Sequence, residues 1–407
     1  MSTTSSYQYL SRLENAVKQH ESWRVGECLN MIASENFSSP QTRGMLVTDF
    51  ANRYTAPDKF YRGSRFMDEV QALAEEVARK VYNAKFADVR PTSGHAADIA
   101  LLLTLVNRGD KIVSVGLESG GYPGISHVGL GKILGLKNLY FAFDERAFNI
   151  DAKATRHLLE LEKPNLLVFG SSFLPFPQPV REVSSMVDGE AICVYDGSHV
   201  MGLLAGGEFQ DPLREGCSLL LGSTHKSLPG PQGGLILGNN EEVFERVSSQ
   251  IHPGIIDNVH WNRVAALAVS LLEMMQFGKA YAQATVKNSQ ALGKGLAERG
   301  IAVKGAALGY SKSHQVLLDC DKARGELYAK RLEESNIIID NGGRVGTAEA
   351  TRMGMGPAEM DQIAELMAFA IQGKKPSDFT KKKVRSLIKD FKVPRYVLRS
   401  VAETAKE

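Results

Sequence analysis

The chain has 407 residues, of which 48 are lysine or arginine and 46 are aspartate or glutamate, giving a formal net charge of +2. This near balance gives no reason to expect a nucleic acid or a membrane as partner. The length and the 43% hydrophobic content predict a globular protein with a large core, usually divided into more than one domain. We therefore expect a protein that acts on small molecules.

Cysteine usage and the N-terminal residues narrow the class further. The four cysteines, Cys28, Cys193, Cys217 and Cys320, form no CxxC pair and have no histidine at metal-ligand spacing, so we expect no metal site and a reducing cytosol. The first residues lack the basic-then-apolar order of a signal peptide, and no apolar run approaches the roughly 20 residues that span a bilayer. These observations predict a soluble, cytoplasmic protein.

Taken in chain order, the first predicted elements are two amphipathic helices. Apolar residues at three- and four-residue spacing predict one helix over 7–30, and MDEVQALAEEVARKVYN predicts a second over 67–83. Short apolar runs then alternate with helical segments. The runs are KIVSVGL at 111, NLLVFGS at 165, AICVYDGS at 191, SLLLGST at 218 and GGLILGN at 233. Apolar strands separated by helices predict βα units and a parallel sheet covered on both faces.

The C-terminal part has a different pattern of apolar and polar residues. A long helical pattern starts near 260, strand-like runs follow at 313 (SHQVLLDC) and 336 (NIIID), and the tail from 373 is basic and punctuated by proline. We divide the chain into an N-terminal helical arm (1–45), a large α/β domain (46–275) and a smaller C-terminal α+β domain (276–407).

Three motifs next to predicted strands carry chemistry. In VRPTSGHAADIALLLTLV, Ser93 and Gly94 stand at a helix start, where backbone N–H groups suit an anion; a plain N-cap is the alternative. Asp196 ends the apolar run of VYDGSH, and Lys226 follows the next run in GSTHKSLPGPQGG. Each has an ordinary alternative, a turn cap for Asp196 and a surface charge for Lys226. Together, a phosphate site, an acid and a lysine at a sheet edge are the parts that pyridoxal phosphate requires.

This order of motifs resembles the fold-type I pyridoxal phosphate enzymes and, within them, the serine hydroxymethyltransferase family, especially its archaeal-like branch. The matching fragments are MIASENFSSP at 31, NRY at 52, YRGSRFMDEV at 61, VRPTSG at 89, FGSSFLPFPQPV at 169, VYDGSHVMGLLAGGEFQDPLREG at 194, GSTHKSLPGPQGG at 222, HPGIIDN at 252, SHQVLLD at 313 and VGTAEATRMGM at 345. Each is weak alone, but their order is highly specific. The resemblance implies an α/β fold with a mostly parallel seven-stranded sheet and a smaller C-terminal domain.

The resemblance also implies roles for individual residues. Lys226 would form the Schiff base, Asp196 would pair with the pyridinium nitrogen, and His225 and Tyr61 would complete the catalytic set. The other implied cofactor contacts are Ser93 and Gly94 at the phosphate, Tyr122 stacked on the ring, Ser172 and His199 near the phenolic oxygen, and Tyr54 and Gly254 from a neighbouring subunit. Ser34 and Arg352 would bind the substrate carboxylate. A site shared between subunits implies a homodimer.

The chain departs from the family where folate-dependent members carry an acid/base glutamate. In those members the RY pair is followed by Ala-Glu-Gly, whereas the segment 53–63, RYTAPDKFYRG, is shorter and keeps Asp58 as its carboxylate. The loop before RVGT, which helps to bind the pteridine in the family, is also short. Tyr122 stands where the family has a histidine, and Asp98 replaces an asparagine.

These departures predict an enzyme that keeps reversible aldol chemistry between glycine and a β-hydroxy amino acid of the serine or threonine type, with an aldehyde as partner and without tetrahydrofolate. Relatives of this kind resemble threonine transaldolases and α-methylserine-type aldolases. Three alternatives stay open. One is a folate-dependent glycine hydroxymethyltransferase in which Asp58 replaces the glutamate. The others are an aminotransferase, racemase or β-eliminating enzyme that uses the same cofactor, and a cofactor-binding subunit without turnover.

Overall fold

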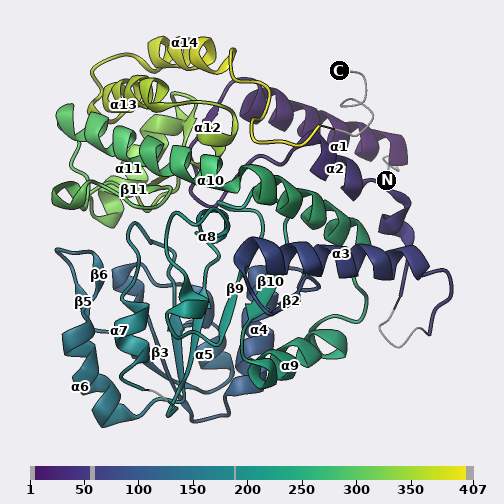
Figure 1. The fold of residues 1–407 in the computed structure, drawn as a ribbon. Coiled ribbons are helices and arrows are strands. Elements are labelled where there is room, and N and C mark those ends of the chain that lie inside the picture. Colours follow the sequence, from purple (N-terminus) through teal and green to yellow (C-terminus); the bar gives the residue numbers. More distant parts are fainter. Residues whose placement is uncertain (1–4, 56–59, 188, 400–407) are drawn as a thin grey trace.

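The computed structural model of the chain describes residues 5–55, 60–187 and 189–399 (Figure 1). A seven-stranded sheet forms the centre of the larger, lower part of the molecule in Figure 1. Its strands, in spatial order, are β2 (Phe86–Asp88), β10 (Gly234–Gly238), β9 (Leu219–Ser223), β8 (Ile192–Asp196), β7 (Leu166–Phe169), β3 (Lys111–Ser114) and β4 (Lys137–Tyr140). β10 runs antiparallel to both of its neighbours, and the remaining pairs are parallel. The predicted seven-stranded, mostly parallel sheet is confirmed.

Helices cover both faces of this sheet, because the central strands are apolar on both sides. In β7, Leu167 and Phe169 enter one core, whereas Leu166 and Val168 enter the core on the opposite face. The helices of the first face include α3 (Arg65–Tyr82) and α10 (Trp261–Glu298), and those of the second include α4 (Gly94–Leu105) and α9 (Glu241–Gln250). The uninterrupted apolar runs of the sequence therefore mark strands that are buried on both faces.

Shorter elements connect this framework. They are α2 (Pro40–Leu46), α5 (Leu130–Ile133), β5 (Phe143–Asp144), β6 (Asn149–Ile150), α6 (Ala152–Glu162), α7 (Val180–Ser184) and α8 (Met201–Ala205).

A second core lies above the sheet in Figure 1, among the C-terminal elements. These are β11 (Gln315–Leu317), α11 (Lys322–Glu333), β12 (Ile337–Ile338), β13 (Arg344–Gly346), α12 (Ala348–Arg352), α13 (Pro357–Gln372) and α14 (Ser377–Ile388). Leu292 and Leu296, near the end of α10, belong to this core, whereas Leu267 and Leu271 of the same helix pack toward the sheet. The proposed boundary between 275 and 276 thus falls inside one continuous helix.

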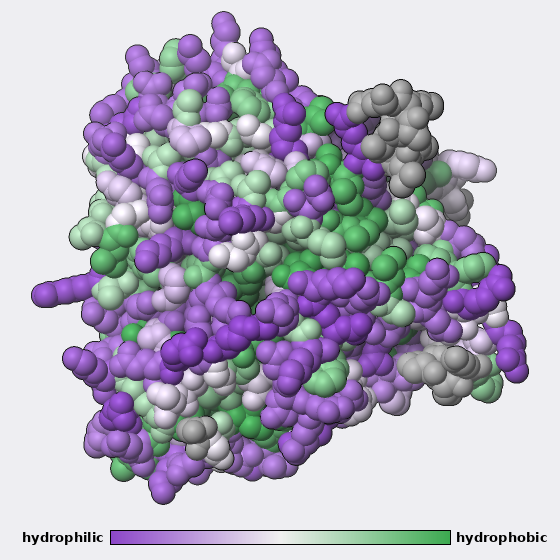
Figure 2. Space-filling model, in the orientation of Figure 1, coloured by the Kyte–Doolittle hydropathy of each residue, from purple (hydrophilic) through white to green (hydrophobic). Residues whose placement is uncertain are grey.

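The N-terminal arm differs from the single helix expected over 7–30. α1 (Ser6–His20) continues into a wider helical turn over Glu21–Val25, and the chain then forms β1 (Leu29–Asn30), which pairs with β12. No side chain of α1 is buried. Apolar surface extends across the middle of the molecule, over α10 and its neighbours (Figure 2). None of the described helices combines the length and the apolar character that crossing a bilayer requires.

Candidate active site

A small polar pocket lies where the central strands of the sheet end. Asp196 is the last residue of β8 and Ser223 the last residue of β9. Because neighbouring parallel strands end at the same edge, their C-terminal residues meet there. The pocket is lined by His95, Asp98, Tyr122, Ser171, Ser172, Asp196, Ser198, His199, Ser223 and Lys226. The fold therefore gathers five of the residues singled out in the sequence, namely Tyr122, Ser172, Asp196, His199 and Lys226.

Lys226 lines this pocket from the loop after β9. Its carbonyl accepts a hydrogen bond from Asn36 Nδ2 at 2.8 Å, which ties the loop to the N-terminal segment. Burial lowers the pKa of the Lys226 ammonium, and Arg344 lowers it further, whereas Asp196 and Asp98 act in the opposite direction. The amine is therefore deprotonated more readily than that of an exposed lysine, which is what attack on a carbonyl group requires.

His225 precedes Lys226 but is not among the residues that line the pocket. Burial lowers its pKa to about 4, and the nearby Lys226 contributes to the same effect. Its Nδ1 atom is buried without a hydrogen-bond partner among the described residues. The structure thus places a neutral imidazole beside the lysine.

The start of α4 approaches the ends of β8 and β9 so closely that it has no room for a side chain at Gly94. A Cβ atom there would lie 2.5 Å from Ser223 Oγ and 3.0 Å from Ser198 Oγ, so the position requires glycine. Ser93 Oγ accepts a hydrogen bond from the Ala96 N–H at 2.9 Å, so Ser93 caps the helix. The cap satisfies one N–H group of the first turn, and the others are the kind of donors that bind anions.

His199 is a buried histidine between the pocket and the C-terminal domain. Burial lowers its pKa well below the usual range, so the imidazole is neutral. Its Nε2 faces Arg344 Nη1 at 3.3 Å; since a guanidinium only donates, the proton of His199 is on Nδ1. That Nδ1 has no partner among the described residues. The ring of His314 stacks on that of His199, with 6.0 Å between the ring centroids. The Nε2 atom of His314 contacts the carbonyl of Ala33, which precedes the predicted substrate ligand Ser34.

Arg344, on β13, is not a lining residue but contacts two residues that line the pocket, His199 and Ser172, and sequence reasoning did not assign it to the site. Besides contacting His199, its Nη1 donates to the carbonyl of Ser172, and its Nε donates to Asp340 Oδ2 at 2.8 Å. The ring of Phe173 lies 5.0 Å from the guanidinium carbon. The short turn before β13 therefore aims the guanidinium at the pocket, because Asp340 Oδ1 also accepts from the backbone N–H groups of Gly342 and Arg344.

Arg352, which the resemblance assigns to the substrate carboxylate, is not among the residues that line the pocket. Its side chain is 1% exposed, and its Nη2 donates to Glu273, whose side chain is fully buried in α10. Nη1 donates to the Tyr396 carbonyl at 2.6 Å, and Nε donates to the Phe37 carbonyl at 3.4 Å. All three guanidinium nitrogens thus have partners, Nη2 in a buried ion pair with Glu273 and the other two at backbone carbonyls.

Tyr122 and His95 form a hydrogen-bonded pair on the pocket wall. The Tyr122 hydroxyl lies 3.2 Å from His95 Nδ1. Burial raises the pKa of Tyr122 to about 12, and Asp98 and Asp196 contribute to the same shift, so the phenol stays protonated. An aromatic ring is therefore present where the family places a histidine, together with a second ring that sequence reasoning left without a role.

Tyr54, Tyr61 and Gly254 do not line the Lys226 pocket of the same chain. The Tyr54 hydroxyl hydrogen-bonds to Asp257, and the Tyr54 and Tyr61 rings lie 4.8 Å apart. Gly254 belongs to the Ile251–Ile255 turn, close to Asp257 in sequence. A role at the cofactor therefore requires that another subunit supplies these residues. Asp58, the carboxylate of the shortened segment, lies outside the described residues.

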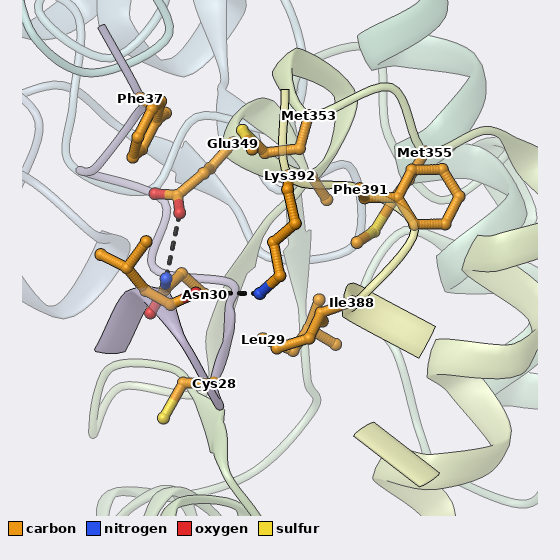
Figure 3. Close-up of a pocket in the computed structure, with 12 residues that line it drawn as sticks. Cys28, Leu29, Asn30, Phe37, Glu349, Met353, Met355, Ile388, Phe391 and Lys392 are labelled. Carbon is orange, nitrogen blue, oxygen red and sulfur yellow. Dashed lines mark hydrogen bonds between the residues drawn. The ribbon is translucent and has the colours of Figure 1, made fainter. Parts of the chain in front are cut away.

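A second pocket lies between the N-terminal arm and the C-terminal segment and shares no lining residue with the Lys226 pocket (Figure 3). Most of its lining is apolar, with Glu349, Asn30 and Lys392 as polar groups. Asn30 Nδ2 donates to Glu349 Oε1 at 3.0 Å. Burial raises the pKa of Glu349 to about 7. This carboxyl group is therefore protonated in the folded protein at mildly acidic pH.

Comparison with a solved structure defines the fold class. L-threonine transaldolase from Pseudomonas fluorescens, crystallised in its internal aldimine state, matches this chain with a TM-score of 0.90 at 23% sequence identity. The match covers 98% of this chain and 97% of that one. The chain accordingly has the fold of this enzyme, the fold type I that the motifs predict.

The family follows from the sequence relatives. The family model of serine hydroxymethyltransferase matches residues 10–367. The serine hydroxymethyltransferase of Methanocaldococcus jannaschii is 40% identical over 404 residues, covering 92% of both chains. That of Methanopyrus kandleri is 37% identical over 401 residues, covering 94% of this chain and 93% of its own length. The chain belongs to the serine hydroxymethyltransferase family, and the predicted resemblance to its archaeal-like branch is confirmed.

Proposed function

We propose that the Lys226 pocket binds pyridoxal 5′-phosphate and that the enzyme makes and breaks the Cα–Cβ bond of β-hydroxy amino acids without folate. The observation that carries the proposal is the meeting of Lys226, Asp196 and His199 in one buried pocket at the carboxyl edge of the sheet. When bound, the cofactor supplies a carbonyl that condenses with amines and a ring that takes up the electrons of the breaking bond. The other requirements fall on side chains of this chain.

The residues present fit this cofactor at both ends of the pocket. The backbone N–H groups at the N-terminus of α4, which Gly94 lets pack closely against the ends of β8 and β9, suit a phosphate. Asp196, held by a hydrogen bond of 2.9 Å from the Ser198 N–H to its Oδ1, suits a protonated ring nitrogen. Tyr122 offers an aromatic face, and the unpartnered Nδ1–H of His199 offers a donor to an oxygen.

Arg344 is the residue that we assign to the substrate carboxylate, in place of Arg352. Its guanidinium can present a planar pair of N–H groups, and Asp340 holds it in orientation from the opposite side. His199 lies beside it and keeps the proton on Nδ1. The substrate amine is thereby directed toward Lys226, whose lowered pKa favours the neutral form that exchanges with an incoming amine.

Two loops differ from those of folate-dependent family members, and both differences support a reaction without folate. The segment 53–63 lacks the family glutamate, and the carboxyl groups that line the described pocket are Asp98 and Asp196. The turn before β13 packs directly on Phe173, since a Cβ on Gly342 would lie 2.8 Å from Phe173 Cζ. A flat pteridine ring at this turn would have to displace Phe173. A folate-dependent hydroxymethyltransferase is the second candidate, because the 37–40% identical relatives are named serine hydroxymethyltransferase.

We also propose that the active enzyme is a homodimer whose sites combine residues of both subunits. Tyr54, Tyr61 and Gly254 lie outside the pocket of their own chain. Large apolar side chains are exposed on α1, including Tyr7 at 81% and Leu13 at 63% exposure, and α1 buries none of its side chains in the monomer. Burial of this surface against a second copy would remove it from water.

The cofactor assignment is tested by loading the purified protein with pyridoxal phosphate and recording its visible absorbance. The wild type should show the band of a lysine-bound cofactor, and Lys226→Ala should lack it. Lys279→Ala, on the helix that crosses both domains, serves as the matched lysine control and should keep the band. A band that survives in Lys226→Ala would refute the assignment. The reaction is tested by adding L-threonine and identifying glycine and acetaldehyde among the products.

A further inference from the structure

Asp98 is a buried carboxyl group that the proposed chemistry does not use. It lies one helical turn after Gly94 in α4 and lines the same pocket as Asp196 and Lys226. The residue is 1% exposed, and its Oδ1 has no hydrogen-bond partner among the described residues. A polar atom left unpaired in the interior destabilises the fold, so such an atom at the wall of a pocket calls for a functional explanation.

Four groups face this carboxyl group from the surrounding elements. Asp196 at the end of β8 disfavours a negative charge on Asp98, and Lys226 after β9 favours it. In its own helix, His95 Nδ1 lies 4.0 Å from Asp98 Oδ2. From the opposite wall, Tyr122 contacts that same Nδ1. His95 Nδ1 is therefore closer to the Tyr122 hydroxyl, at 3.2 Å, than to Asp98.

The balance of these groups favours a neutral Asp98. Burial raises the pKa of its carboxyl group well above the usual range, and the charge of Asp196 raises it further, while Lys226 opposes the shift. A second carboxyl group in the same pocket makes a charge on Asp98 less favourable, because like charges repel each other.

We propose that Asp98 and Asp196 form an acid–carboxylate pair in which Asp98 keeps the proton and donates it toward Asp196. Asp98 is then a positioning residue for the carboxylate that meets the ring nitrogen. An asparagine, which the family carries here, offers an N–H donor but no proton that can leave. Asp98 would therefore place a second, ionisable acid beside the ring of the cofactor. The inference rests on the proposed cofactor site and is independent of the substrate and of folate.

The first test needs no cofactor. Infrared difference spectra of the cofactor-free protein at pH 7 compare the wild type with Asp98→Asn, after circular dichroism has shown that both are folded. The carbonyl stretch of a protonated carboxylic acid should be present in the wild type and lost in the variant. Glu349→Gln is the control, because Glu349 also holds a proton near neutral pH; its band should be separate from that of Asp98. No loss of intensity in Asp98→Asn would overturn the proposal.

The second test follows cofactor binding and its pH dependence. Asp98→Ala should weaken pyridoxal phosphate binding roughly tenfold, because Asp196 loses a donor in a buried site, and Asp98→Asn should recover most of that loss. The pH midpoint of the visible absorbance change should be the same in the wild type and in Asp98→Asn below pH 8. The proposal that Asp98 is a neutral donor would be overturned if both variants weakened pyridoxal phosphate binding equally. It would also be overturned if the pH midpoint of the absorbance change were a full pH unit lower in Asp98→Asn than in the wild type. An inactive wild type with these spectra would refute only the proposed reaction.

Discussion

Arg344 and Arg352 belong to one short fragment, yet the fold gives them opposite surroundings. Arg344 stands at the pocket beside His199, with Asp340 on its other side. Arg352 is enclosed with Glu273, and neither side chain has more than 1% exposure. An arginine that binds a substrate needs free donors at a pocket, whereas a fully buried pair serves the packing of two helices.

Substitution of each arginine by glutamine separates these roles. Arg344→Gln should raise the KM for the amino acid roughly 100-fold, through loss of a charged, bidentate contact, with little change in stability. Arg352→Gln leaves Glu273 as a buried, unpaired charge and should lower the free energy of unfolding by about 3–5 kcal/mol. Urea unfolding and steady-state kinetics measure the two effects. If Arg352→Gln raised KM while Arg344→Gln did not, the carboxylate would belong to Arg352 after all.

At this scale the sequence predicted a large part of the site. Lys226, Asp196 and His199 follow apolar runs, so the parallel sheet brings them to one edge whatever the loops do. The choice between the two arginines was beyond sequence reasoning, because the partner that engages Arg352 is Glu273, far away in the chain. Asp98 was recognised in the sequence as a departure from the family. Its proposed role depends on sharing a pocket with Asp196, which only the structure shows.

At the scale of elements, the first turn of α12 contains a carboxyl group, that of Glu349, whose protonation changes near neutral pH. Burial raises the pKa of Glu349 to about 7, against a usual value of 4.5. Between these values the folded protein holds a proton that the unfolded chain releases. Stability from this group is therefore complete below about pH 4.5 and is lost as the pH rises through 7.

Glu349→Gln should remove this pH dependence, because glutamine keeps an oxygen that accepts from Asn30 and does not ionise. From pH 5 to pH 8 the variant should gain about 2–3 kcal/mol in free energy of unfolding relative to the wild type. Denaturant unfolding at both pH values measures the difference. Glu326→Gln, at an exposed position of α11, is the control and should follow the wild type. A parallel course of wild type and Glu349→Gln would contradict the raised pKa.

The sequence predicted the strands that are buried along most of their length. It did not predict the strands that are polar or that depend on a partner far away in the chain. β7, β8, β9 and β10 are buried along most or all of their length, so their apolar runs stand out. β4, KNLY, lies at the edge of the sheet and carries polar residues, so no run marks it. β1 is a two-residue strand that forms by pairing with β12, far away in the chain. Its residues fall within the helical pattern of 7–30, so that pattern predicted a helix there.

At the scale of the whole molecule, the proposed dimer makes each site depend on two chains. Lys226→Ala should be inactive through its own site, and Tyr54→Ala through the site of its partner. Mixing the two variants under conditions that exchange subunits should restore roughly a quarter of the wild-type activity, since half of the dimers are hybrids with one intact site. Activity that stays absent in the mixture, with exchange verified, would show that Tyr54 serves its own chain or none.

The central claim is cleavage of β-hydroxy amino acids by a serine hydroxymethyltransferase-family enzyme that does not need folate. The measurement that tests it most directly is the rate of aldehyde release from L-serine and L-threonine by the cofactor-loaded protein, with and without tetrahydrofolate. We predict release from at least one of the two substrates without folate, at a rate that tetrahydrofolate leaves unchanged. Release from serine that requires tetrahydrofolate, with none from threonine, would contradict the claim and identify a folate-dependent hydroxymethyltransferase.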